Sequence, residues 1–188
     1  SGAGKSSLLN LLVAFEHPDT GTIDRAQANG LSEPSVFWVP QDYGLWPFLT
    51  VHEHLTAVTA DTDRIDSMLD AFDLSELATA KPTVLSHGER SRLAVVRALM
   101  TGANVLVMDE PLSNVNPEQT LRYWDVVRDH ITANDVNLIF ATHSARTVLR
   151  EAEHVFCMDN GALTYHGSVE ELYSHPSTEQ LAQVLGDA

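Results

Sequence analysis

Two kinds of hydrophobic pattern alternate along most of the chain. Residues 36–39 and 105–108 are short, continuous apolar runs, which are typical of fully buried strands in a parallel sheet. Further strands are predicted over residues 138–141 and 154–159. The helices predicted around these strands cover residues 5–16, 88–100, 117–132 and 147–153. Because helix and strand signals alternate, the pattern predicts an α/β domain with a mostly parallel sheet.

The middle of the chain has a different character. From Thr50, a candidate N-cap, to about residue 80 the pattern is helical and no strand signal occurs. Within residues 61–72 the apolar side chains recur at helical spacing; they are Ile65, Met68, Leu69 and Phe72. We therefore expect a helical subdomain, at about residues 50–100, inserted into the α/β core.

Shorter elements are predicted at the two ends of the chain. Asn160 and Gly161 form a strong hairpin signal, which joins strand 154–159 to a strand at residues 162–165. A short strand is expected at residues 22–23, and short helices are expected at residues 169–174 and 178–185.

Composition limits the classes of function. The net charge of −15, with Lys5 and Lys81 as the only lysines, argues against nucleic acid as a partner. No apolar run approaches the roughly 18 to 20 residues that cross a bilayer, so a membrane role requires a partner. The single cysteine, Cys157, excludes a disulfide framework and favours a reducing compartment; we expect it to be an inert core residue.

The chain opens on SGAGKSS, the second half of a phosphate-binding loop. In such a loop the glycines let backbone N–H groups surround the phosphates of ATP, the lysine reaches the β- and γ-phosphates, and the following hydroxyl binds Mg²⁺. Lys5 and Ser6 fit these two roles. The candidate cofactor-binding residues are Ser1, Gly2, Ala3, Gly4, Lys5, Ser6 and Ser7. The full pattern has a glycine before Ser1, so we expect a truncated N-terminus; the alternative is a flexible glycine turn before a helix.

Residues 105–110 read VLVMDE, an apolar strand that ends in two acids. Asp109 is placed to hold Mg²⁺ through water, and Glu110 is placed to act as a general base on the attacking water. The alternative is a strand that happens to end in acids.

Residues 85–90 read LSHGER and open a helix. Ser86 and the Gly88 amide at a helix N-terminus form an anion site, although the chain already has a phosphate loop. Here the residues resemble the ATP-binding subunit of ABC transporters. In that family the signature loop of one subunit, which residues 85–90 resemble, caps the γ-phosphate held by the other, so the resemblance implies a site completed by head-to-tail pairing. It adds Ser86, His87, Gly88 and Glu89 to the cofactor-binding residues.

The remaining motifs of the family occur in its usual order. Gln41 matches the glutamine loop, which senses Mg²⁺ and the attacking water. Residues 113–116 match the D-loop, and His143 matches the switch histidine that contacts the γ-phosphate. The separations, 109 − 86 = 23 and 143 − 109 = 34 residues, are usual for the family. The resemblance covers essentially residues 1–188 and implies a P-loop ATPase core with an inserted helical subdomain.

Three positions depart from the family pattern. His87 replaces a glycine of the signature loop, Glu89 replaces its glutamine, and Asn116 replaces the aspartate of the D-loop. A bulky ring beside the phosphate could alter affinity, and slower or differently coupled hydrolysis is expected. The adenine-stacking aromatic residue of the family lies upstream, so none is assigned.

The resemblance implies ATP hydrolysis with Mg²⁺ that drives transport. The expected partners are a second ATP-binding subunit, membrane permease subunits and a possible solute-binding protein, with the chain peripheral at the cytoplasmic face of the plasma membrane. The segments at residues 167–176 and 185–186 resemble those of bacterial import ATPases and favour import over export, without identifying a substrate. The alternatives are a soluble ABC ATPase of DNA repair or translation and a nucleotide-gated binding module that hydrolyses little.

Two further segments each have two interpretations. His52, Glu53 and His54 look like metal ligands, but positions two apart on a helix point to different faces. Residues 45–51, reading LWPFLTV, either form a docking surface for a partner helix or pack within the helical subdomain.

Overall fold

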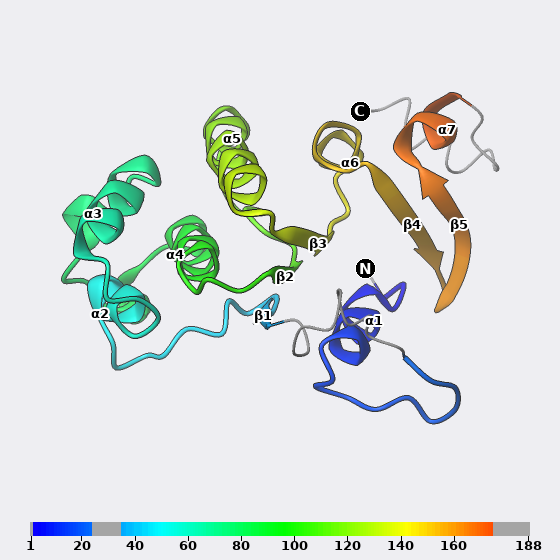
Figure 1. The fold of residues 1–188 in the computed structure, drawn as a ribbon, viewed down its shortest axis with the longest axis horizontal. Coiled ribbons are helices and arrows are strands. Elements are labelled where there is room, and N and C mark those ends of the chain that lie inside the picture. Colours follow the sequence, from blue (N-terminus) through cyan, green and yellow to red (C-terminus); the bar gives the residue numbers. More distant parts are fainter. Residues whose placement is uncertain (1, 24–34, 175–188) are drawn as a thin grey trace. The chain divides into compact units, whose positions relative to one another are not determined.

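The computed structural model describes residues 2–23 and 35–174. The chain forms two compact units, one made of residues 1–17 and 141–188 and the other of residues 18–140. Figure 1 labels the helices and strands of both.

The unit of residues 18–140 contains a three-stranded sheet. Its strands are β1 (Val36–Val39), β2 (Val105–Asp109) and β3 (Asn137–Ala141), in that spatial order. β1 and β2 are parallel, with Val39 opposite Met108. The helices of this unit are α2 (Val51–Thr56), α3 (Thr62–Ala71), η1 (Ser75–Leu77), η2 (Pro82–Val84), α4 (His87–Leu99) and α5 (Pro117–Asn134). The predicted α/β architecture with parallel strands is confirmed.

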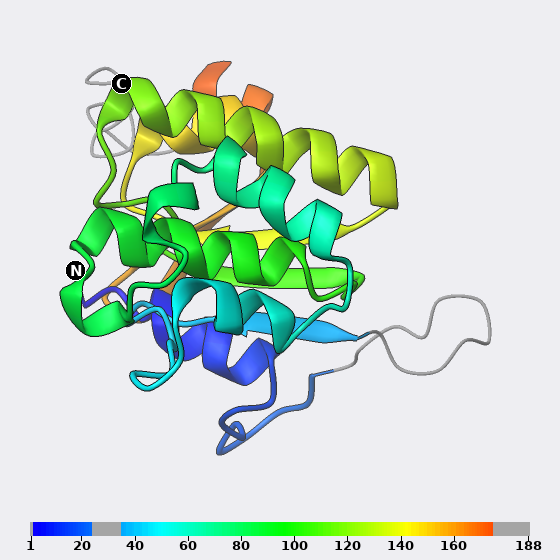
Figure 2. The same ribbon diagram turned by 90° about the vertical axis from the view of Figure 1, so that its left-hand side faces the viewer.

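Helix α4 is the centre of the core of this unit. Seven consecutive residues, Leu93 to Leu99, are buried, so the helix is covered on all sides over its second half. It contacts β1 and α2, and Figure 2 shows it running alongside the strands of the sheet. Each fully buried large apolar side chain contributes roughly 1.5–3 kcal/mol. The N-terminus of α4, which carries the signature loop, therefore stands on a firmly packed base.

The predicted helical segment forms as two capped helices. The Thr50 hydroxyl accepts a hydrogen bond from Glu53 N at 3.2 Å and the Glu53 carboxylate accepts one from Thr50 N at 2.7 Å, which confirms Thr50 as the N-cap. Asp61 caps α3. The four apolar residues predicted to face the core of this segment are buried: Ile65, Met68, Leu69 and Phe72. The subdomain boundary at about residues 50–100 stays a prediction.

The other unit pairs helices with a β-hairpin. It contains α1 (Lys5–Leu12), α6 (Ala145–Glu151), β4 (His154–Asp159), β5 (Ala162–Ser168) and α7 (Val169–Ser174). β4 and β5 are antiparallel, and the chain turns between them at Asn160 and Gly161, whose φ angles are 47° and 77°. Asn and Gly are the residues that adopt positive φ most easily, so the predicted hairpin is confirmed for that reason.

Some local predictions differ from the structure. The first helix ends at Leu12 rather than at residue 16, because Ala14 adopts a φ of 59° and the amides of Phe15 and Glu16 turn back to the Asn10 carbonyl. Residues 22–23 are not in a strand, and the predicted helix at residues 178–185 lies outside the described residues. In the described part of the chain, no helix combines the length and apolarity that crossing a membrane requires.

Candidate nucleotide-binding site

The phosphate loop leads into α1 without a side-chain cap. Its N-cap is Gly4, in the left-handed region at φ 92°, and the first turn of the helix carries no acidic residue. By contrast, α2, α3, α4, α5 and α6 each begin with a side chain that caps the helix. Backbone N–H groups at an uncapped helix start are suited to an anion. Gly161 N donates to Ala3 O at 3.1 Å and braces this loop, while Ser1 lies outside the described residues.

The end of β2 is conformationally strained. Asp109 is 4% exposed at the last position of the strand, and Glu110 follows with a φ of 52°. Leu112 also has a left-handed φ, of 60°, and its N–H donates at 3.0 Å to the hydroxyl of buried Ser91 on α4. Left-handed non-glycine residues cost of order 1 kcal/mol or more and persist where neighbours hold them, often at functional sites. Helix α4 thus holds the turn that presents Glu110.

The sheet register places Gln41 near these acids in the same unit. Val39 pairs with Met108, so Gln41, two residues after β1, and Asp109, the last residue of β2, lie at the carboxyl ends of adjacent parallel strands. Ligands bind at that edge in open α/β sheets, and amide and carboxylate oxygens are ligands that Mg²⁺ accepts. Among residues 2–23 and 35–174, no group of three or more His, Cys, Asp or Glu side chains is placed to hold a metal ion. Mg²⁺ is usually held by one or two protein oxygens together with substrate phosphates.

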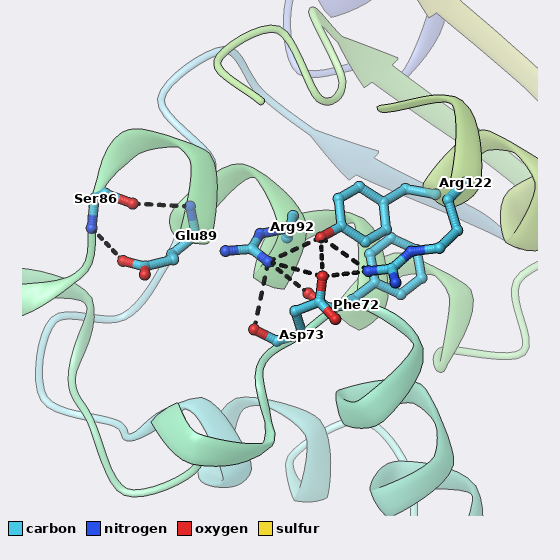
Figure 3. Close-up of polar contacts among 7 residues, drawn as sticks. Phe72, Asp73, Ser86, Glu89, Arg92 and Arg122 are labelled. Atoms are coloured by element: carbon cyan, nitrogen blue, oxygen red, sulfur yellow. Dashed lines mark hydrogen bonds and ion pairs between the residues drawn. The ribbon is translucent and has the colours of Figure 1, made fainter. Parts of the chain in front are cut away.

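The signature loop caps α4 reciprocally. The Ser86 hydroxyl accepts from Glu89 N at 3.3 Å, and the Glu89 carboxylate accepts from Ser86 N at 2.7 Å (Figure 3). The hydrogen bond from the Ser86 backbone, and after it the one with the Ser86 side chain, lowers the pKa of Glu89, so the carboxylate stays ionised. The Glu89 side chain therefore serves the helix cap, and its predicted role toward nucleotide stays a prediction. The Ser86 hydroxyl still has a proton to donate to an acceptor.

The signature loop packs directly on the D-loop. A Cβ added to Gly88 would lie 2.8 Å from the carbonyl oxygen of Asn114, so only glycine fits this contact. Asn116 caps α5, accepting from Glu118 N at 3.0 Å, and Asn and Asp are equally good N-caps. Ser86, His87, Gly88, Asn114 and Asn116 line one pocket. The replacement of aspartate by Asn116 therefore preserves the local fold of the D-loop.

The His87 ring has a partner within its own unit. Its Nδ1 lies 3.3 Å from the hydroxyl of Tyr43, which also accepts a hydrogen bond from the Asn114 side chain at 3.0 Å. Tyr43 has a left-handed φ of 73°. Nothing in the hydrophobic pattern distinguished Tyr43, although its place two residues after Gln41 was a signal available in the sequence. The predicted effect of His87 on phosphate affinity stays a prediction.

A buried arginine holds the loop around Tyr43. Arg97 is 3% exposed and donates to the carbonyls of Gly44 at 2.8 Å and Tyr43 at 3.1 Å, with Trp46 and Phe37 against its guanidinium. Burial lowers the pKa of Arg97 to about 10, which leaves it charged at neutral pH. Its position in an otherwise apolar run, residues 93–100, was the sequence signal that could have identified it.

A second polar cluster joins three elements of the same unit. The Asp73 carboxylate accepts from the Tyr123 hydroxyl at 2.6 Å and pairs with Arg122, while Arg92 donates to Phe72 O at 2.8 Å (Figure 3). The hydrogen bond from Tyr123 lowers the pKa of Asp73, and its effect is larger than that of either Arg122 or Arg92. The cluster ties the end of α3 to α4 and to α5, which carry the signature loop and the D-loop at their N-termini.

His143 and Cys157 belong to the other unit. His143 is exposed between β3 and α6, and its role as switch histidine stays a prediction. Cys157 is half-buried, so it is not the core residue that the sequence predicted. Burial raises the pKa of its thiol, which accords with the expected low reactivity.

For residues 45–51 the sequence left two interpretations, a docking surface and packing within the helical subdomain, and the segment has both buried and exposed side chains. Val51 is fully buried, whereas Trp46 is 41% and Phe48 is 65% exposed. His54 is also fully buried, and its ring accepts from Trp46 N at 2.9 Å and bonds to Thr50 O at 2.7 Å. With both ring nitrogens occupied, His54 is a structural residue, in line with the rejection of a metal site here.

We predict that acid destabilises the fold through His54. Burial of the ring lowers the pKa of His54 below its ordinary value of 6.5. The hydrogen bond to Thr50 raises this pKa by less, and the positive charge of Arg97 lowers it further. Above that pH the ring is neutral in both states; below it the unfolded chain takes up the proton first, so the free energy of unfolding falls by at most about 1.4 kcal/mol per pH unit. Urea unfolding between pH 7.5 and 5.5 measures this slope.

The variants that check this are His54→Gln and His17→Gln. His54→Gln should flatten the slope, whereas His17→Gln, at an exposed position, should leave it unchanged. Some slope should remain in His54→Gln, because burial also lowers the pKa of His130. An unchanged slope in His54→Gln would contradict the assignment.

Comparison with known proteins identifies the family. Residues 1–113 match the family model described as ABC transporter. The Fe(3+) ions import ATP-binding protein FbpC of Pseudomonas fluorescens is 31% identical, with 100% of this chain covering 58% of that protein. A probable sulfate/thiosulfate import ATP-binding protein CysA of Chlorella vulgaris is 33% identical, with 99% of this chain covering 84% of that protein.

A similarity in structure accompanies the similarity in sequence. The chain superposes with a TM-score of 0.74 on a dimeric ATP-binding cassette in a post-hydrolysis state bound to ADP and Pi, at 21% identity and covering 89% of this chain and 81% of that one. At that identity the likeness establishes the fold alone. With the family model and the two relatives, it shows that the chain belongs to the ABC transporter family, among its ATP-binding proteins.

Proposed function

We propose that this chain is the ATP-hydrolysing subunit of an ABC importer and works as a pair of such subunits. The observation that carries the proposal is the signature loop built onto the D-loop, with Gly88 against Asn114 and Ser86 at the start of α4. The capping box of α4 uses the N–H groups of Ser86 and Glu89. The Ser86 hydroxyl proton and the first-turn N–H groups of His87 and Gly88 suit a terminal phosphate, and the chain has a separate phosphate loop at α1. Two anion sites on one chain are explained if each copy lends its signature loop to the nucleotide of the other.

The proposed reaction is attack of water on the γ-phosphorus of ATP, which breaks the bond to the β–γ bridging oxygen and yields ADP and phosphate. Lys5 and the N–H groups of the phosphate loop hold the phosphates. Glu110 accepts the proton of the attacking water, and Gln41 and His143 position that water and contact the γ-phosphate. Ser86 donates its hydroxyl from the other copy.

The chemistry of Gln41 and Asp109, at the carboxyl ends of adjacent parallel strands, suits magnesium. These two residues would supply oxygen ligands, Asp109 through water, and the motif around Ser6 predicts that its hydroxyl would supply another. Bound Mg²⁺ would neutralise charge on the β- and γ-phosphates as the bond breaks.

Import is favoured because both curated relatives above carry import in their names. This chain spans only 58% of the first of them, so the transported substrate, the permease and any solute-binding protein are matters for experiment. Trp46 and Phe48, exposed after Gln41, suit a permease helix that rests on this face. Binding to a permease would place the chain at the cytoplasmic face of the membrane.

The test is phosphate release by the full chain, together with recovery of the chain in the membrane fraction with its permease. We expect Mg²⁺-dependent release and membrane recovery that high salt alone does not abolish. Phosphate release without any membrane association would favour a soluble ABC ATPase. The net charge of −15 argues against one that binds nucleic acid. Nucleotide binding without release would favour the weakly hydrolysing module.

A further inference from the structure

The Tyr43 hydroxyl lies where three loops of one unit meet. It is 3.3 Å from His87 Nδ1 of the signature loop and 3.0 Å from Asn114 Nδ2 of the D-loop, while Tyr43 itself follows Gln41 by two residues. A single phenol oxygen therefore joins the glutamine loop to both loops that the proposed function directs at the nucleotide of the other copy.

The Tyr43 hydroxyl makes both hydrogen bonds at one oxygen atom. The Asn114 side-chain NH₂ can only donate, so Tyr43 Oη accepts from it. His87 Nδ1 bonds to the same hydroxyl, which can donate or accept according to the tautomer of the ring. These two hydrogen bonds, called the Tyr43 relay below, tie the orientation of the His87 ring to that of the D-loop.

Tyr43 is held rigidly enough to act as a support. Its left-handed backbone, at φ 73°, is kept in place by a bond from Tyr43 N to Pro40 O at 2.9 Å and by the bond from Arg97 to its carbonyl at 3.1 Å. The opposite side is equally constrained, because Gly88 has no room for a side chain against Asn114 O. Residues held in strained conformations by several bonds are often functional.

We infer that Tyr43 is a positioning residue of the composite ATP site. Its hydroxyl sets the signature loop and the D-loop in one fixed relation, and the signature loop is thereby presented to the nucleotide of the other copy. His87, which replaces a small glycine of the family pattern, takes part through its hydrogen bond with Tyr43. This inference rests on the proposed function and extends it to Tyr43, a residue outside the family motifs.

The test is Tyr43→Phe in the full chain, which keeps the ring and removes the hydroxyl. Loss of two hydrogen bonds should lower kcat for ATP roughly tenfold. The affinity of a single copy for ADP should stay unchanged, because ADP uses only that copy's own phosphate loop. A purely structural defect would weaken both. The matched control is Tyr173→Phe, at an exposed tyrosine of α7, which should change neither quantity.

Two His87 variants separate the relay from general packing. His87→Asn keeps a hydrogen-bonding group near the position of Nδ1 and should retain most of the activity, whereas His87→Ala removes one of the two Tyr43 bonds and should give a smaller loss than Tyr43→Phe. The double variant Tyr43→Phe/His87→Ala should be no slower than Tyr43→Phe alone, because Tyr43→Phe already removes the bond to His87.

The outcomes separate this inference from the proposed function. If the wild-type chain releases no phosphate, the proposed function fails. If the wild type is active and Tyr43→Phe matches it, or if the two single effects multiply in the double variant, the inference alone is overturned. Should Tyr43→Phe fail to fold, as judged by circular dichroism, the comparison of His87→Asn with His87→Ala decides: equal rates overturn the relay.

Discussion

Glu110→Gln is expected to lower ATP turnover by about 100-fold or more while leaving ATP binding intact. The amide has almost the shape of the carboxylate, so the left-handed turn at φ 52° and its support by Ser91 can persist. What the amide cannot do is accept a proton from water, and a positioned general base contributes about 10²- to 10⁴-fold. Steady-state phosphate release measures the loss.

The same variant should accumulate as an ATP-bound pair. If closure of two copies depends on contacts made by the γ-phosphate, a site that binds but does not hydrolyse ATP stays closed. Size-exclusion chromatography with ATP and with ADP distinguishes the states, and Glu118→Gln, at an exposed acid on α5, is the control that should behave as wild type. A Glu110→Gln chain that binds ATP yet stays monomeric would contradict the proposal that two copies share each ATP site.

Local sequence signals predicted the elements that depend on local physics. Thr50 was predicted as an N-cap because it is a hydroxyl residue at the start of a helical pattern. The structure forms this cap and adds the return bond from Thr50 N to the Glu53 carboxylate. The run at residues 105–108 became β2, extended by Asp109, because a continuous apolar segment is stable only when buried on both faces. The Asn160–Gly161 turn formed because its two residues accept positive φ.

Features that depend on distant contacts were not predictable in this way. Apolar periodicity continues past Leu12, but the turn at Ala14 ends α1. Tyr43 and Arg97 gain their roles only when residues 54 positions apart meet, as in the bond from Arg97 to the Tyr43 carbonyl. Helix geometry argued against a metal site at His54, but it could not show that His54 is buried and accepts a hydrogen bond from Trp46 N.

The candidate site shows the same division. Spacing and order indicated Gln41, Ser86, Asp109 and Glu110, because short motifs carry their chemistry in residue type and separation. Spacing could not indicate that Glu89 turns back onto Ser86 N, or that His87 points to Tyr43. Both departures from the family pattern therefore acquired a structural role that a motif comparison does not contain.

Lys5→Ala is expected to weaken ATP binding by roughly 10- to 100-fold, the effect of losing one hydrogen bond between charged groups. A chain of net charge −15 repels a polyanion, so binding depends on local donors, and Lys5 stands at the first position of the uncapped α1. Lys81 is the only other lysine and is exposed, so Lys81→Ala removes the same charge from the chain without removing it from the loop. Titration calorimetry with ATP compares the two variants. Equal losses in both would mean that overall charge controls the affinity, and no loss in Lys5→Ala would remove the phosphate loop from the site.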